Sequence, residues 1–169
     1  SKPGDNAPPS VALFMGVQGE EQDTILKHLG NRVQFGREVS RLAREDLVPY
    51  GQRILIINRA QAGRGIAAAC RLARAPNLDG TTVIVIFGDE YQDASRALAA
   101  RTRYQADICE TIPANWSALI ASIDHALDLR RPFVHLQILP ETVAETIDRL
   151  EKSLNTGSYY ELLSLNSHV

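Results

Sequence analysis

Short apolar segments recur along the chain at lengths that fit buried β-strands. Residues 11–15 (V-A-L-F-M), 53–57 (R-I-L-I-I) and 81–87 (T-T-V-I-V-I-F) are nearly continuous apolar runs, and the last two are rich in β-branched side chains. Such runs are typical of parallel strands that are covered on both faces. Residues 32–35 and 107–110 predict two further, shorter strands.

Between these segments the apolar positions take the spacing of helices that bury one face. Residues 20–29, 37–47, 66–75, 93–104 and 115–129 have this spacing, and residues 58–65 read as a loop. Five strands alternating with five helices predict an α/β fold with helices on both sides of a parallel sheet. We expect a flavodoxin-like, doubly wound, five-stranded sheet with strand order 2-1-3-4-5, formed by residues 11–130.

The two ends of the chain differ from this domain in pattern. Residues 1–10 contain several proline, glycine and asparagine residues and predict a flexible leader. Residues 131–169 predict a helical extension, with an amphipathic stripe over residues 141–154. This extension either packs on the domain, pairs with a second copy or leads into an output domain of which only the start is present.

Composition and charge narrow the classes of function. Hydrophobic residues make up 44% and charged residues 22% of the 169 residues, as in globular domains. The formal net charge of −2 argues against a nucleic-acid partner, which would require many cationic side chains. No apolar run approaches the roughly 20 residues that span a membrane, and no cationic region followed by an apolar stretch begins the chain. We therefore expect no membrane partner and no signal peptide.

The cysteines and histidines do not predict a metal site. Cys70 and Cys109 lie in apolar segments without metal-ligand spacing, and the four histidines are scattered. We expect two buried, reduced thiols, a cytoplasmic location, no metal and no cofactor.

Residues 105–113 (Q-A-D-I-C-E-T-I-P) carry the most informative motif of the chain. This stretch resembles the fifth strand of receiver domains of bacterial response regulators, which usually reads G-A-D-x-Y-L-x-K-P. Ala106, Asp107 and Pro113 keep that frame, whereas Ile112 stands at the lysine position. The resemblance implies a receiver-like fold over most of residues 11–129, and a cis peptide bond between Ile112 and Pro113.

The resemblance also implies where phosphoryl chemistry would lie, and the sequence departs from it at each position. A working receiver holds Mg²⁺ with acids after the first strand, phosphorylates an aspartate after the third, and balances the charge with a hydroxyl and a lysine after the fourth and fifth. Gly16, Asn58, Gly88 and Ile112 stand at these positions. We therefore predict an atypical receiver, or pseudo-receiver, with a degenerate phosphorylation site.

Other acids lie close to these positions in the sequence. Asp89 and Glu90 follow the fourth strand and either face the crevice in place of the lost acids or are solvated loop residues. In the second case, Asp93 caps the helix that follows. Glu20 and Glu21 either reach a metal or form the acidic first turn that the helix dipole favours.

If the receiver-like domain lacks phosphoryl chemistry, we predict that it is a protein-interaction module in two-component-type signalling. Its partner is another protein or a second copy of the chain. Arg96, Arg101, Arg103 and Tyr104 form the predicted interaction face, because arginine and aromatic residues are enriched at interfaces. The other interpretation of these four residues is an ordinary solvated helix surface.

Two alternatives concern ligands and catalysis. Residues 63–65 (G-R-G) permit a close backbone approach to a phosphate, which would suit a small-molecule or nucleotide sensor, although no G-x-G-x-x-G or Walker sequence is present. Arg59 and Arg64, in the same segment, either bind an anion or are plain surface residues. The sequence has no nucleophile elbow, Ser-His-Asp signature or clustered metal ligands, so we expect no enzymatic activity and no catalytic residues.

The tail contains one further resemblance. Residues 157–165 (G-S-Y-Y-E-L-L-S-L) are similar to the opening of a J domain, which often reads D-Y-Y-E-L-L-G-V. The other interpretation of this tail is an amphipathic terminal turn unrelated to J domains.

Overall fold

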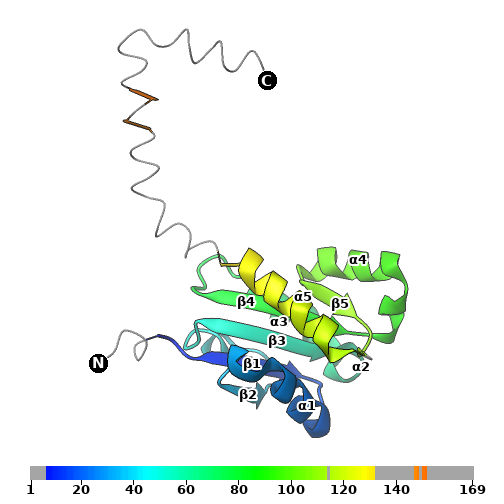
Figure 1. The fold of residues 1–169 in the computed structure, drawn as a ribbon. Coiled ribbons are helices and arrows are strands. Elements are labelled where there is room, and N and C mark those ends of the chain that lie inside the picture. The colour runs from blue at the N-terminus through cyan, green and yellow to red at the C-terminus, as the bar shows by residue number, and fades with distance from the viewer. Residues whose placement is uncertain (1–6, 114, 132–146, 149, 152–169) are drawn as a thin grey trace. The chain divides into compact units, whose positions relative to one another are not determined.

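The computed structural model describes residues 7–113, 115–131, 147–148 and 150–151. Five parallel strands form one sheet in the order β2-β1-β3-β4-β5 (Figure 1). The strands are β1 (Ser10–Met15), β2 (Phe35–Glu38), β3 (Gln52–Asn58), β4 (Thr81–Phe87) and β5 (Ile108–Glu110). The predicted flavodoxin-like α/β fold and its strand order are confirmed.

Helices cover both faces of this sheet. The α-helices are α1 (Gly19–Leu29), α2 (Arg59–Ala62), α3 (Ile66–Ala73), α4 (Ala94–Tyr104) and α5 (Trp116–Leu129), and short 3₁₀ helices are η2 (Gly30–Arg32), η3 (Arg44–Asp46), η4 (Gly63–Gly65) and η5 (Asp89–Gln92). Side chains of α1 and α5 pack on one face, and those of α3 and α4 on the other (Figure 1). Four of the five predicted helices are confirmed to within two residues, and α2 and η4 occupy the predicted loop at 58–65.

The continuous apolar runs reflect a sheet that is buried on both sides. In β1, Leu13 and Met15 belong to the core beneath α3 and α4, whereas Ala12 and Phe14 belong to the core beneath α1 and α5. All four side chains are buried. Alternate residues of a strand point to opposite faces, so both faces require apolar side chains and the sequence shows no polar alternation.

Two predicted elements between β1 and β3 are wrong. The second strand was predicted at residues 32–35 but begins at Phe35, and residues 37–47 form no α-helix. The described chain between β2 and β3 contains only the short η3. The apolar residues assigned to the inward face of that helix are nevertheless buried: Val39, Leu42 and Leu47.

Asp46 explains why this segment turns instead of continuing as a helix. Its carboxylate accepts a hydrogen bond of 2.8 Å from the backbone N–H of Ala43, and it forms an ion pair of 2.8 Å with Arg37. Aspartate side chains that bind nearby backbone N–H groups compete with the hydrogen bonds of a regular helix.

The chain divides into two units, Ser1–Arg130 and Arg131–Val169. In the second unit the described residues Ile147, Asp148, Leu150 and Glu151 are helical. The remainder of the helix predicted at 141–154, the J-domain-like stretch at 157–165 and most of the predicted leader lie outside the described residues. No helix among the described residues is long and apolar enough to cross a membrane.

Candidate functional site

A pocket of about 290 Å³ lies at the carboxyl ends of β3, β4 and β5. We call it the strand-end pocket, and its lining comprises Asn58, Arg59, Ala60, Phe87, Gly88, Asp89, Glu90 and Ile112. Carboxyl ends of parallel strands meet at one edge of a sheet, which is where doubly wound folds bind ligands. The pocket unites three of the four predicted degenerate positions and both predicted crevice acids.

Asn58 is the last residue of β3 and the N-cap of α2. Its Oδ1 accepts a hydrogen bond of 3.2 Å from the backbone N–H of Ala60. Asparagine is a favoured N-cap because its side-chain oxygen satisfies a free N–H of the first turn. The amide therefore has a structural role, and it carries no negative charge with which to attack a phosphoryl group.

At Gly88, the side chain that the receiver resemblance implies would crowd Glu90 and Tyr91. Its N–H donates to the carbonyl oxygen of Glu110 at 3.1 Å, which joins the ends of β4 and β5. A Cβ at this position would lie 2.8 Å from Glu90 Oε1 and 3.0 Å from the ring of Tyr91. A serine or threonine here would require both side chains to move.

Ile112 lines the pocket with an exposed hydrocarbon side chain, 48% accessible. It supplies no positive charge to the pocket. The described residues contain no cis peptide bond, so the prediction of a cis bond between Ile112 and Pro113 is wrong.

Gly16, the fourth predicted position, lies at the end of β1 beneath the backbone of α2. Its φ is +69°, and a Cβ there would lie only 2.5 Å from the backbone nitrogen of Ala62 and 2.8 Å from the backbone carbon of Gln61. The α2 turn therefore covers the place where the resemblance would put magnesium-binding acids. Glu20 and Glu21 lie in the first turn of α1.

The charged side chains of the strand-end pocket neutralise one another in part. Arg59 and Glu90 form an ion pair of 2.8 Å, with both side chains partly exposed. Burial alone would lower the pKa of Arg59, but Tyr91 and Glu90 outweigh burial and raise that pKa. Asp89 is exposed at the same pocket, so the lining holds two carboxylates and one guanidinium. No group of three or more possible metal-binding side chains occurs among the described residues.

Asp93 follows these acids and has the predicted capping role. Its Oδ1 accepts hydrogen bonds from the N–H groups of Ser95, at 2.9 Å, and Arg96, at 3.4 Å. The bond from the Ser95 hydroxyl is the largest of the contributions that lower the pKa of this carboxyl. Asp93 therefore begins α4 a few residues after Asp89 and Glu90, which line the strand-end pocket.

The predicted interaction face is divided between two sides of α4. Arg96, Arg103 and Tyr104 line a cavity beside Arg59 and Tyr91. Arg101 instead lines a groove of about 490 Å³, which we call the α4–β5–α5 groove; it also includes Ile108, Cys109, Glu110, Ala121, Ser122, His125 and Leu129. The structure therefore gives the four residues two different surroundings.

Two buried polar networks were not anticipated from the sequence. Asp107 forms ion pairs of 2.6 Å with Arg74 and 2.5 Å with Arg130, and it accepts the N–H of Ile84 at 2.8 Å. Arg53 is 1% exposed and donates to Thr82 at 2.8 Å and to backbone carbonyls around β3. The sequence indicates that Arg53 is unusual because it places a charged residue at the start of an apolar strand.

Both cysteines are free and buried, as predicted. Burial is the main cause that raises the pKa of the Cys70 thiol to about 11 and that of Cys109 to about 12. Neutral thiols are poor nucleophiles and poor metal ligands.

Comparison with solved structures supports the fold. A structure described as an adenylate cyclase from Rhodopirellula baltica aligns with a TM-score of 0.57 and 14% identity, covering 79% of this chain and 97% of the other. A fusion that contains the trimeric coiled coil of yeast Spc42 aligns with a TM-score of 0.52 and 12% identity, covering 84% and 96%. At these identities the likeness shows the fold alone.

The BeF3-activated DrrB receiver domain aligns with a TM-score of 0.48 and 14% identity, covering 71% of this chain and 97% of that domain. No protein-family model and no curated protein matches the sequence.

Proposed function

We propose that the chain is a receiver-like signalling module that takes no phosphoryl group and acts through protein–protein interaction in a bacterial two-component-type pathway. The observation that carries this proposal is the lining of the strand-end pocket. An amide, a glycine and an isoleucine stand where the resemblance requires a nucleophile, a hydroxyl and a cation. Asn58 cannot form an acyl phosphate, and Ile112 cannot balance its charge.

Electrostatics support the same proposal. A phosphoryl group brings about two negative charges at neutral pH. In the strand-end pocket it would meet Asp89 and Glu90, while the guanidinium of Arg59 is already paired with Glu90 at 2.8 Å. Like charges in a partly enclosed site repel more strongly than in water. We propose that the pocket has no enzymatic role.

Acetyl phosphate with Mg²⁺ tests this proposal directly, with intact-mass spectrometry as the readout. We expect no added phosphoryl group on the wild-type chain. The Asn58→Asp variant should also remain unlabelled, because Gly16 is covered by α2 and Ile112 supplies no cation. Stable, Mg²⁺-dependent labelling of a wild-type carboxylate would contradict the proposal.

The α4–β5–α5 groove is the surface that best suits a protein partner. It lies along β5, which is an edge strand of the sheet. Leu129, in its lining, is 70% exposed, and Leu98 of α4 is 57% exposed. Exposed apolar side chains with polar neighbours such as Arg101 and His125 are typical of interaction sites. We propose a second copy of the chain as the partner, because a two-fold dimer is the commonest closed assembly.

Light scattering across a range of protein concentrations measures this assembly. We expect Leu129→Asp to lower the dimer fraction because it places a charge in the contact. Val48→Asp is the matched control: Val48 is 55% exposed but lies in the β2–β3 connection and does not line the groove. A strict monomer at high concentration, or an equal effect of the two variants, would rule out this dimer.

A further inference from the structure

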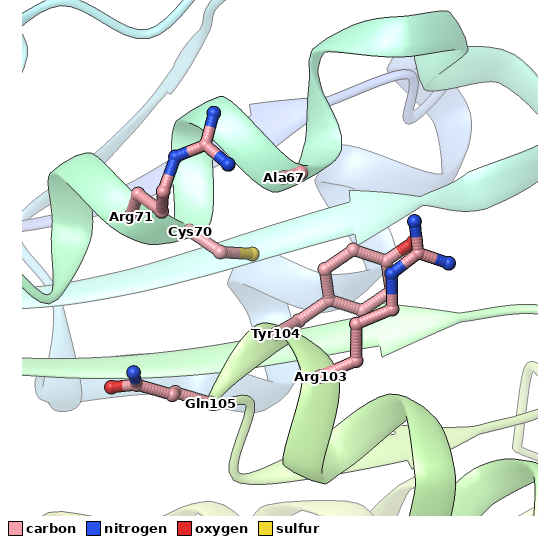
Figure 2. Close-up of a pocket in the computed structure, with 6 residues that line it drawn as sticks. All are labelled: Ala67, Cys70, Arg71, Arg103, Tyr104 and Gln105. Carbon is pink, nitrogen blue, oxygen red and sulfur yellow. The ribbon is translucent and has the colours of Figure 1, made fainter.

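Two neighbouring cavities lie beside α4: one is lined by residues of α3 and α4, and the other by residues of α2, η5 and α4. The first, of about 350 Å³, is lined by Ala67, Cys70, Arg71, Arg103, Tyr104 and Gln105 (Figure 2). The second, of about 290 Å³, is lined by Arg59, Glu90, Tyr91, Arg96, Ala99, Ala100, Arg103 and Tyr104. They share Arg103 and Tyr104, and we call the pair the arginine groove.

The two helices supply the walls of the first cavity. Figure 2 shows Cys70 of α3 pointing toward the ring of Tyr104, with the Arg103 side chain beside that ring. The guanidinium carbon of Arg103 lies 5.1 Å from the centre of the Tyr104 ring. This cation–π contact holds a long side chain at the boundary between the two cavities. Arg71 brings a second guanidinium from α3.

Positive charge exceeds negative charge along the arginine groove. Arg71 and Arg103 form no ion pair with any described residue. Arg96 is 4.0 Å from Asp93, and both side chains are more than half exposed, so solvent weakens that pair. Only Arg59 is closely paired within the described lining, through Glu90 at 2.8 Å. Of the four arginines that line the arginine groove, Arg71 and Arg103 therefore lack a carboxylate partner among the described residues.

A buried hydroxyl adds a second observation in the second cavity. Tyr91 is 6% exposed, and this burial raises the pKa of its hydroxyl. Arg59 can only donate toward that hydroxyl, and it acts to lower the pKa without meeting normal hydrogen-bond geometry, so the hydroxyl proton has no acceptor among the described residues. Buried polar groups without partners are rare in folded proteins and call for an explanation such as a ligand. A phenol can donate a hydrogen bond to a ligand oxygen.

We propose that the arginine groove binds a small polyanion, namely a phosphorylated molecule with two or more phosphate groups. Guanidinium groups bind phosphate through paired hydrogen bonds, and several of them around one cavity favour a highly charged ligand. The cavity volumes are close to the lower end of those that hold small molecules. The second cavity shares Arg59 and Glu90 with the strand-end pocket, but the proposal concerns binding of an anion without phosphoryl transfer.

The lining favours a small anion over a protein segment. Protein interfaces are built around exposed apolar or aromatic anchors. None of the exposed large apolar side chains among the described residues lines either cavity, and Tyr104 itself is 9% exposed. The G-R-G stretch proposed from the sequence for phosphate binding forms η4 and, within the described chain, belongs to neither cavity.

Pyrophosphate is the probe for this site, followed by two-dimensional NMR of the full chain with arginine Nε signals. We expect saturable shifts of residues around Arg71 and Arg103 at millimolar pyrophosphate. Arg103→Gln and Arg71→Gln should each weaken binding about tenfold or more, because each removes a charged donor of paired hydrogen bonds to phosphate. Arg41→Gln is the matched control, because Arg41 is an exposed arginine in the β2–β3 connection. Circular dichroism verifies that each variant is folded.

Three outcomes would overturn the proposal. One is the absence of saturable shifts, and another is an equal loss of binding in Arg41→Gln, which would show attraction to general surface charge. The third is tighter binding of citrate than of pyrophosphate, which would assign the site to carboxylates. Selective loss in Arg71→Gln and Arg103→Gln, with pyrophosphate preferred, would support it. None of these outcomes depends on the labelling test or on the dimer.

Discussion

The packing of α2 over the end of β1 can be tested by adding a single methyl group. Gly16 and Gly63 have nearly the same φ, +69° and +71°. At Gly16 a Cβ would lie 2.5–2.9 Å from three backbone atoms of α2, whereas at Gly63 nothing lies within 4 Å. Gly63→Ala therefore serves as the matched control for Gly16→Ala.

The expected magnitudes follow from these two environments. A positive φ of this kind costs a residue with a side chain about 1–3 kcal/mol, and both variants incur that cost. Gly16→Ala must also displace the α2 backbone, and overpacking of this sort costs about 1–3 kcal/mol more. We expect Gly16→Ala to lower the free energy of unfolding by that additional amount relative to Gly63→Ala.

Urea unfolding followed by far-UV circular dichroism measures the difference. The dependence of free energy on urea should be equal in the two variants, so that the midpoints report stability. Equal destabilisation by both substitutions would refute the claim that α2 fills the space beside Gly16. It would also reopen that space for acids that bind a cation.

Three further predictions concern buried ionisable groups. Asp107→Asn should destabilise the fold by about 3–5 kcal/mol, because it leaves the buried guanidinium of Arg74 without its counter-charge. Asp124→Asn breaks the ion pair with Arg32, whose side chains are 33% and 44% exposed, and should cost about 1 kcal/mol or less. Urea unfolding measures both changes in stability. Burial raises the pKa values of the Cys70 and Cys109 thiols to about 11 and about 12, so both should react slowly with Ellman's reagent at neutral pH until the chain unfolds. Rapid reaction in the native state would contradict their burial. Burial also raises the pKa of Glu110 above its ordinary value of 4.5, so the wild type should lose stability relative to Glu110→Gln as pH rises through that raised value; a constant difference across this pH range would show that Glu110 is not desolvated.

The fold could be predicted from the sequence where burial dictates the pattern. β3 and β4 lie at the centre of the sheet and are covered on both faces, so their apolar runs identify them with little ambiguity. The edge strand β2 is mostly exposed and lacks such a run. Buried positions at 39, 42 and 47 fit a helix by spacing alone, but the hydrogen bond that the Ala43 N–H donates to the Asp46 carboxylate depends on three-dimensional context.

The sequence predicts which residues form the candidate site, but it does not predict which side chains and helices surround them. Asn58, Gly88 and Ile112 lie at or just after the ends of β3, β4 and β5, and parallel topology brings them to one pocket. The ion pair between Arg59 and Glu90 joins residues from different connections. Neither this pair nor the cover of α2 over Gly16 has a local sequence signal. The division of the predicted interaction face also required the structure, because it depends on which neighbours flank α4.

The most direct test of the account is a titration of the chain with beryllofluoride and Mg²⁺, which together mimic a phosphorylated aspartate, followed by NMR of the backbone amides. We predict that the signals of residues around Asn58, Gly88 and Ile112 do not move. Saturable, Mg²⁺-dependent shifts confined to that pocket would contradict the conclusion that it takes no phosphoryl group.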